Sequence, residues 1–246
     1  MSDTETGREE PYLSLVIPVY NGAAFVARSI ETALRFLDRQ GYPFELIVVD
    51  DGSADGTRAA LAPHESRLRV LANDRNRGKG HAVRRGVLAA RGRYIVFTDA
   101  DLPFTLEPLS AFLQALERDS DMVIGWRDPV QSAAMMRPSL IRRVGSHLFT
   151  FLVSRFAVPG ISDTQCGLKG FRRAAAHALF AVGRIDRFAF DVELLHLARK
   201  RRLAVTRLPV RLVDNGPSSV RPFRDGVTAA KDLLRIMWHD RLGHYQ

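Results

Sequence analysis

Two carboxylates, Asp99 and Asp101, follow the apolar run Tyr94-Ile95-Val96-Phe97 with one residue between them. The run has the character of a buried strand. Alternate residues of an extended segment share a face, so both carboxylates can approach one ion. Hard divalent cations prefer carboxylate oxygens, and Mg²⁺ is bound through one or two carboxylates together with substrate phosphates. Spacing alone is compatible with a metal–phosphate site, but in most proteins such a pair is a solvated turn.

Three further polar clusters also follow predicted strands. They are Pro18-Val19-Tyr20-Asn21, Asp50-Asp51 and Arg77-Gly78-Lys79-Gly80. In an open parallel α/β sheet, ligands bind outside the carboxyl ends of the strands. Four polar clusters are therefore expected at one edge of the sheet, which favours a metal site over a turn at the two aspartates.

Each cluster also has a plainer interpretation. Asp50-Asp51 could mark only a helix entry, with Ser53 or Asp55 as the N-cap. Residues 77–80 open a predicted helix, whose free N–H groups favour anions, yet a solvated basic turn has the same spacing. The dinucleotide fingerprint G-x-G-x-x-G is absent after the first predicted strand, which argues against an NAD enzyme.

Strands and helices alternate along the predicted chain. Strands are expected at 12–19, 44–49, 68–71, 93–98, 121–126 and 204–213, and helices at 22–39, 78–91, 105–118, 140–156, 190–202 and 223–238. The strands are continuous apolar runs, as in sheets that are buried on both faces. The pattern predicts an α/β protein with a mostly parallel central sheet flanked by helices on both faces.

Composition narrows the function classes. The chain has 246 residues, a net charge of +9 and one cysteine, Cys166, which fits a reducing cytoplasm. The polar residues 1–10 resemble a disordered lead-in more than a signal peptide, and no run is long and apolar enough for a transmembrane helix. The charge suits acidic partners, but a nucleic-acid partner is not expected, because a stacking platform and a recognition motif are missing. None of the seven histidines shows metal-ligand spacing.

Six ordered motifs carry a family resemblance. They are IPVYN, VVDDGS-ADGT, N-x-GKG, TDAD, the segment Asp163–Lys169 and the segment Phe190–Leu194. With them the chain resembles family 2 inverting glycosyltransferases of the GT-A fold. Among these it is most similar to the dolichyl- or polyprenyl-phosphate sugar synthases, particularly the glucosyltransferase branch, which also shows a segment like Ser219–Asp225. The resemblance runs from about Leu13 to about Ile236.

The resemblance implies a single GT-A domain over 11–246, with a nucleotide-binding half at 11–126 and an acceptor-binding half at 127–246. It implies a nucleotide site made by Pro18, Tyr20, Asn21, Asp50, Asp51, Lys79, Asp99 and Ala100. Asp99 and Asp101 are expected near the diphosphate and a bound Mg²⁺ or Mn²⁺. The chain departs from many relatives at Gly22, where they have Glu, and at Leu102-Pro103-Phe104 after the DAD.

The implied reaction is inverting transfer of a sugar, expected to be glucose from UDP-glucose, to a polyprenyl or dolichyl phosphate. The alternatives are a soluble sugar, glycan or small-molecule hydroxyl acceptor, or the GDP-mannose version of the lipid reaction. A phosphate with a second pKa of about 6 is already largely dianionic at neutral pH and needs cations instead of a base. The candidate cations are Arg142, Arg143, Lys169 and Arg221.

The predicted catalytic set is Asp99, Asp101, Lys169 and Asp191. Asp191 has three possible roles: a general base, a partner of the helix dipole, or a residue that orients Lys169.

Two predicted helices, 140–156 and 223–238, are apolar with basic interruptions. Such helices suit association with a membrane surface or an apolar acceptor groove. The alternative is that they cover the sheet or form a homodimer contact. The two interpretations have equal support for 223–238, whereas the pattern at 140–156 favours lipid. We therefore expect a cytoplasmic protein that associates peripherally with the inner face of the membrane.

Overall fold

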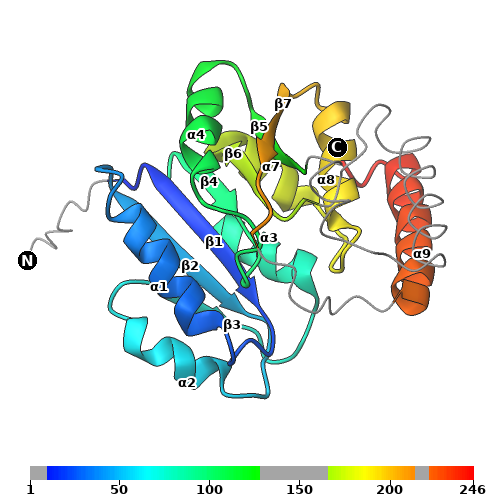
Figure 1. The fold of residues 1–246 in the computed structure, drawn as a ribbon. Coiled ribbons are helices and arrows are strands. Elements are labelled where there is room, and N and C mark those ends of the chain that lie inside the picture. The colour runs from blue at the N-terminus through cyan, green and yellow to red at the C-terminus, as the bar shows by residue number, and fades with distance from the viewer. Residues whose placement is uncertain (1–9, 128–165, 214–221) are drawn as a thin grey trace, which may run out of the picture.

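The computed structural model describes residues 10–127, 166–213 and 222–246 (Figure 1). The strands are β1 (Leu13–Val19), β2 (Phe44–Asp50), β3 (Arg69–Ala72), β4 (Tyr94–Phe97), β5 (Met122–Arg127), β6 (Lys169–Arg172) and β7 (Val205–Val210). The α-helices are α1 (Val26–Leu37), α2 (Thr57–Leu61), α3 (Lys79–Ala89), α4 (Pro108–Arg118), α7 (Arg173–Val182), α8 (Phe190–Lys200) and α9 (Pro222–Arg241).

The seven strands form one sheet in the order β3-β2-β1-β4-β6-β5-β7. The pairs β2·β3, β1·β2, β1·β4 and β5·β7 are parallel. Strand β6 is antiparallel to both of its neighbours, β4 and β5. The predicted α/β class with a mostly parallel sheet is confirmed.

The register brings the carboxyl ends of four strands to one edge. Val19 at the end of β1 pairs with Asp50 at the end of β2, and Asp50 pairs with Ala72 at the end of β3. Phe97 at the end of β4 pairs with Val16 on β1. The polar segments that follow these strands therefore start from the same side of the sheet, as expected.

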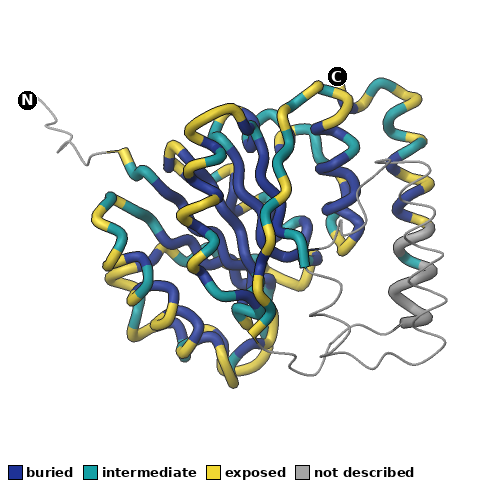
Figure 2. Tube along the Cα trace, turned by 45° about the horizontal axis from the view of Figure 1, so that its top comes forward, coloured by how far each residue is buried: buried dark blue, intermediate teal, exposed yellow. Residues whose placement is uncertain are grey.

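Alternate strand residues feed two cores, one on each face of the sheet. Val16, Ile47 and Ile95 pack in the core that also takes residues of α3, α7 and α8. Their sequence neighbours point the other way, toward the core that takes residues of α1 and α4. Figure 2 shows the buried strands between the two layers of helices. Burying each such aliphatic side chain contributes about 1.5–3 kcal/mol.

Several predicted boundaries needed correction. Strand β6 and helix α7 were not predicted. Strand β6 was missed because its four residues, Lys169–Arg172, are too few to show a period. The helix predicted from 105 begins at Pro108, a residue suited to the first turn because it lacks an N–H to donate. The helix predicted at 140–156, most of the lead-in 1–10, and the residues Arg142, Arg143 and Arg221 lie outside the described residues.

Within the described parts of the chain, no helix is both long enough and apolar enough to cross a membrane.

Candidate active site

Four charged residues meet at the carboxyl edge of the sheet, and we call them the charged quartet: Lys79, Asp99, Lys169 and Asp191. Lys79 begins α3, Asp99 follows β4, Lys169 begins β6 and Asp191 lies in the first turn of α8. Lys169 reaches this edge because β6 runs antiparallel to β4, which pairs Lys169 with Phe97. An antiparallel strand thus brings its first residue to the edge where parallel strands end.

The quartet is joined by two ion pairs. Lys79 Nζ pairs with Asp99 Oδ1. Lys169 Nζ donates to Asp191 Oδ1 at 2.5 Å and to the carbonyl oxygen of Cys166 at 2.7 Å. The side chains of Lys169 and Asp191 are only 1% and 4% exposed, so each charge depends on the other for compensation.

Burial and neighbouring charges shift two pKa values in the quartet. Burial raises the pKa of Asp191, although Lys169 and Lys79 act against that shift. Burial acts to lower the pKa of Lys79, but attraction to Asp99, Asp191 and Asp101 outweighs it, so the pKa of Lys79 is raised. Lys79 therefore remains a cation at neutral pH.

A glycine makes room for the Asp99 carboxylate. A Cβ added at Gly167 would lie 2.0 Å from Asp99 Oδ2, far inside van der Waals contact. Any side chain at this position would push Asp99 out of its place beside Lys79. The close approach of Asp99 thus explains why a glycine stands at position 167.

We expect Gly167→Ala to lower kcat/KM by about tenfold or more, because small misplacements of a positioned group cost rate steeply. Steady-state kinetics on the purified variant, with the thermal midpoint measured in parallel, provide the test. Gly56→Ala is the matched control, since its added Cβ would meet only Ala23 Cβ at 3.6 Å. Equal activity of both variants would contradict the steric role.

The loops after β1 and β2 are tied together by Asn21. Its backbone N–H donates to Ser53 Oγ at 2.9 Å, and its Oδ1 accepts from the Ala54 N–H at 3.0 Å. Asn21 has φ +50°, in the left-handed region that Asn tolerates better than most residues. The neighbouring Tyr20 is 49% exposed, so its ring is open to a ligand, whereas Pro18 is buried in β1.

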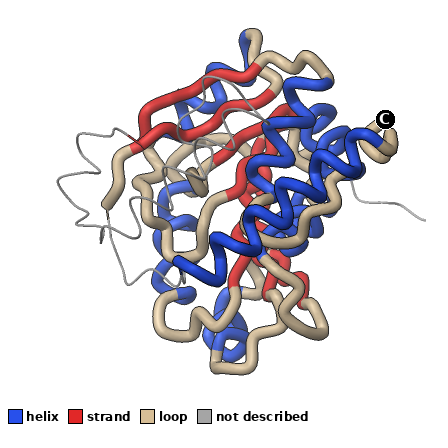
Figure 3. The backbone as a smooth tube through the Cα atoms, turned by 90° about the vertical axis from the view of Figure 1, so that its right-hand side faces the viewer, coloured by secondary structure: helices blue, strands red, loops and turns tan. Residues whose placement is uncertain are grey.

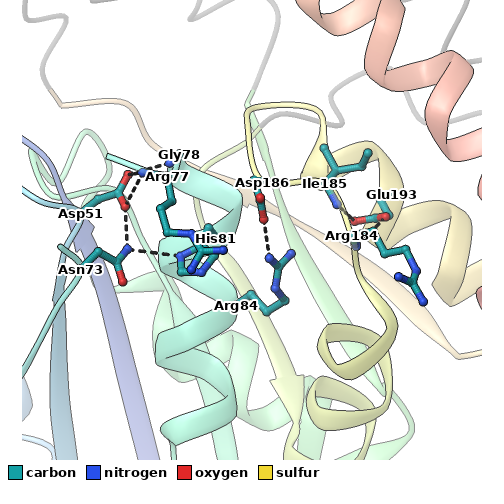
Figure 4. Close-up of polar contacts among 10 residues, drawn as sticks. All are labelled: Asp51, Asn73, Arg77, Gly78, His81, Arg84, Arg184, Ile185, Asp186 and Glu193. Atoms are coloured by element: carbon teal, nitrogen blue, oxygen red, sulfur yellow. Dashed lines mark hydrogen bonds and ion pairs between the residues drawn. The ribbon is translucent and has the colours of Figure 1, made fainter. Parts of the chain in front are cut away.

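Asp50, the last residue of β2, and Asp51, which follows it, have different surroundings. Asp50 Oδ1 accepts from the Ser53 N–H at 3.0 Å, within its own turn. Asp51 is 2% exposed, and its carboxylate accepts from Asn73 Nδ2 at 2.6 Å and from the N–H groups of Arg77 and Gly78 at 3.0 and 2.7 Å (Figure 4). Asp51 therefore holds the loop that leads into α3.

Neither residue considered as an N-cap in the sequence is the N-cap of α2. The helix begins at Thr57 after Gly56, without a side-chain cap. Asp55 instead accepts from the Thr57 N–H at 2.9 Å and from the Ala23 N–H at 3.1 Å. The turn after β2 is thus braced against the loop after β1.

Asn73 is a site residue that the sequence did not reveal. Besides its bond to Asp51, its Nδ2 lies 3.2 Å from His81 Nδ1, and its Oδ1 accepts from Arg85 at 2.6 Å. An Asn in a short polar loop has no pattern that sets it apart. One partner, Asp51, directly follows β2, and the other two lie in α3, so only the folded chain shows them.

A cavity of about 580 Å³ lies beside this loop. Its charged and titratable lining residues are Asp74, Arg75, Arg77, His81, Arg84 and Arg85. Burial lowers the pKa of His81, and the nearby Arg77 lowers it further. Because arginines outnumber the one acidic residue in this lining, the cavity is suited to an anionic ligand.

The two predicted metal ligands do not lie on one continuous strand. Strand β4 ends at Phe97, and the chain turns at Ala100 and Asp101. Leu102 has φ +45° and closes this turn by donating its N–H to the Asp99 carbonyl oxygen at 3.1 Å. Among the described residues, no group of three or more His, Cys, Asp or Glu side chains is arranged to hold a metal ion. Two carboxylates are nonetheless enough for Mg²⁺ or Mn²⁺ when substrate phosphates supply the remaining ligands.

The structure therefore assembles most of the predicted site. Pro18, Tyr20, Asn21, Asp50, Asp51, Lys79, Asp99 and Ala100 lie on the strand ends and loops of the carboxyl edge, with Asp101, Lys169 and Asp191 around them. The individual roles of these residues stay predictions. The predicted acceptor residues Arg142, Arg143 and Arg221 fall outside the described chain.

Comparison with known proteins agrees with this geometry. The family model described as "Glycosyl transferase family 2" matches residues 14–180, about two thirds of the chain. The chain belongs to glycosyl transferase family 2. This match contains Asp99, Asp101 and Lys169, while Asp191 lies beyond it.

Curated relatives of this family 2 chain extend the match to most of its length. It is 33% identical to the dolichyl-phosphate beta-glucosyltransferase of Dictyostelium discoideum, over 94% of this chain and 76% of the relative. The Drosophila melanogaster enzyme of the same name is 36% identical, over 91% and 74%. The Homo sapiens enzyme of that name is 33% identical, over 91% and 74%.

A solved structure shares the fold. Glucosyl-3-phosphoglycerate synthase from Mycobacterium tuberculosis, in complex with Mn²⁺, UDP and glucosyl-3-phosphoglycerate, superposes with a TM-score of 0.65 at 19% identity. The match covers 95% of this chain and 80% of the synthase. The predicted GT-A architecture of the chain is thereby confirmed.

Proposed function

We propose that this glycosyltransferase transfers glucose from UDP-glucose to a polyprenyl or dolichyl phosphate, with inversion at the anomeric carbon. The observation that carries the proposal is the extended similarity to three dolichyl-phosphate beta-glucosyltransferases, each at least 33% identical over at least 91% of this chain. The solved neighbour with UDP and Mn²⁺ supports a nucleotide donor and a divalent cation.

On the donor side, the residues of the carboxyl edge bind and orient. Tyr20 presents an exposed ring to the base, and Asp99 and Asp101 would hold Mg²⁺ or Mn²⁺. A cation held there would supply positive charge to the departing diphosphate. Lys79 adds a second, fixed cation there, and its raised pKa keeps it charged throughout the physiological range.

On the acceptor side, the state of Asp191 favours a phosphate. A hydroxyl acceptor needs a general base within about 2.6–3.2 Å of its proton. Asp191 is buried, and its Oδ1 is bound to Lys169. An acceptor that arrives already as a dianion needs no base. We therefore assign Asp191 to orienting Lys169, and Lys169 to stabilising negative charge in the site.

The deciding experiment supplies labelled UDP-glucose with Mg²⁺ or Mn²⁺ and offers polyprenyl phosphate, a soluble sugar acceptor, or neither. We expect label in an organic-extractable product only with the lipid phosphate, and a parallel GDP-mannose reaction without product. Transfer only to the soluble hydroxyl acceptor would replace the lipid proposal. Lipid-linked mannose in place of glucose would change the donor assignment.

Helix α9 carries a surface that suits the membrane where such a lipid resides. Leu234 and Trp238 on α9, and Leu242 directly after its end, recur every fourth residue and are 67%, 58% and 51% exposed. Residues on the opposite side, such as Leu233 and Ile236, are buried in the core. Figure 3 shows α9 along the outside of the domain. An exposed apolar stripe with basic neighbours is typical of helices that lie on anionic bilayers.

We expect replacement of Leu234, Trp238 and Leu242 by Ser to reduce binding to vesicles with anionic lipids by about tenfold or more, because each buried apolar side chain contributes about 1.5–3 kcal/mol. Vesicle co-sedimentation measures the effect. Leu88→Ser is the matched control, since Leu88 is 43% exposed but lies on α3. Unchanged binding of the triple variant would contradict peripheral association through α9.

A further inference from the structure

The buried carboxylate of Glu193 holds the loop between α7 and α8. Glu193 is 1% exposed, and its oxygens accept from the N–H groups of Arg184 and Ile185 at 2.9 and 3.0 Å (Figure 4). Burial raises the pKa of Glu193, although its hydrogen bonds act against that shift. Glu193 is not part of the site proposed above, so we take its hydrogen bonds to hold the loop in place.

That loop in turn lies against the start of α3. The Asp186 carbonyl oxygen accepts from the His81 N–H at 3.1 Å, and the Asp186 carboxylate pairs with Arg84. A Cβ added at Gly78 would lie 2.4 Å from the Asp186 carbonyl oxygen, and one at Gly80 would lie 2.6 Å from that of Ile185. These two glycines flank Lys79, so the loop sets where the Lys79 backbone lies.

The third donor to Glu193 comes from beyond α9. Tyr245 is 1% exposed, and its hydroxyl donates to Glu193 Oε1 at 2.5 Å. Gly243, with φ +72°, ends the helical segment and turns the chain inward. The phenol therefore anchors the end of α9 to the same carboxylate that holds the loop.

We propose that Tyr245 and Glu193 are positioning residues for the donor site. Tyr245 fixes Glu193, Glu193 fixes the loop 184–187, and the loop fixes Gly78, Lys79 and Gly80. Neither residue belongs to the charged quartet, and the two act through the backbone that carries Lys79. The effect on donor binding rests on the proposed function, whereas the coupling of the loop to α3 stands without it.

The test compares Tyr245→Phe with Tyr42→Phe. Both remove one phenol oxygen and keep the ring, but the buried Tyr42 hydroxyl has no hydrogen-bond partner within the described residues. We expect Tyr245→Phe to speed hydrogen exchange at the Arg184, Ile185 and His81 amides. We also expect it to weaken UDP binding in the presence of Mn²⁺ by about tenfold, equivalent to about 1.4 kcal/mol, and to lower kcat as well, because Lys79 also stabilises the departing diphosphate. Tyr42→Phe should change none of these.

Glu193→Gln provides a second readout, because it keeps the shape and one acceptor oxygen. We expect its exchange rates to be at least as fast, and its UDP affinity at least as weak, as those of Tyr245→Phe, because its NH2 group cannot accept from a backbone N–H that the carboxylate now binds. Faster exchange at Arg184 and Ile185 with an unchanged His81 amide and unchanged UDP affinity would overturn the inference and leave Tyr245 a purely structural residue. If the wild type itself does not bind UDP, the proposed function fails, and the exchange of His81 still decides the coupling.

Discussion

Asp101→Ala should lower metal-dependent turnover by about a hundredfold or more, the usual cost of removing one group that stabilises developing charge. Asp101 is exposed at the end of the turn after β4, so its removal leaves the core intact. Its charge also contributes to the raised pKa of Lys79, which links it to the donor side of the quartet. Steady-state turnover as a function of Mn²⁺ and Mg²⁺ concentration measures the loss.

Asp119→Ala provides the control for Asp101, because Asp119 is an exposed carboxylate at the end of α4. It should keep full turnover and the same metal dependence. Calorimetry of UDP binding with and without Mn²⁺ separates the metal role from a change in fold. Wild-type activity in Asp101→Ala would refute the metal assignment of this residue.

Lys169→Met should destabilise the fold by about 3–5 kcal/mol, because it leaves the buried Asp191 carboxylate without its nearest cation. Asp191 Oδ1 would lose its 2.5 Å partner, and desolvation would drive the carboxyl further toward its protonated form. Urea unfolding at neutral pH measures the free energy of unfolding. The double variant Lys169→Met with Asp191→Leu should recover part of the loss, since no buried charge then stands alone.

The surface pair Lys200–Asp240 is the matched control for this ion pair. Its side chains are 36% and 32% exposed, and Lys200 Nζ lies 2.6 Å from Asp240 Oδ1. Lys200→Met should cost no more than about 1 kcal/mol, as exposed pairs do. An equal loss of unfolding free energy in Lys169→Met and Lys200→Met would contradict this prediction, because burial would then not determine how much the Lys169–Asp191 pair contributes to stability.

The residue pattern alone determined the class of fold and the edge of the sheet at which a ligand is expected. Apolar runs at 12–19, 44–49 and 93–98 predicted parallel strands, because such strands are buried on both faces. The structure forms them at Leu13–Val19, Phe44–Asp50 and Tyr94–Phe97. The carboxylates and the glycine-rich basic turn that follow these strands predicted a ligand edge, because parallel strands end on the same side. The DAD and its companion motifs carried the family resemblance as well.

Only the tertiary structure decided which charges meet. Lys169 joins Asp191 because β6 runs antiparallel and α8 returns to the same edge, and a four-residue strand shows no period in the sequence. Asp51 binds Asn73 and the α3 loop, and Tyr245 binds Glu193, across separations that local pattern does not encode. The sequence thus determined most of the helices and strands, and long-range packing determined which buried polar group satisfies which.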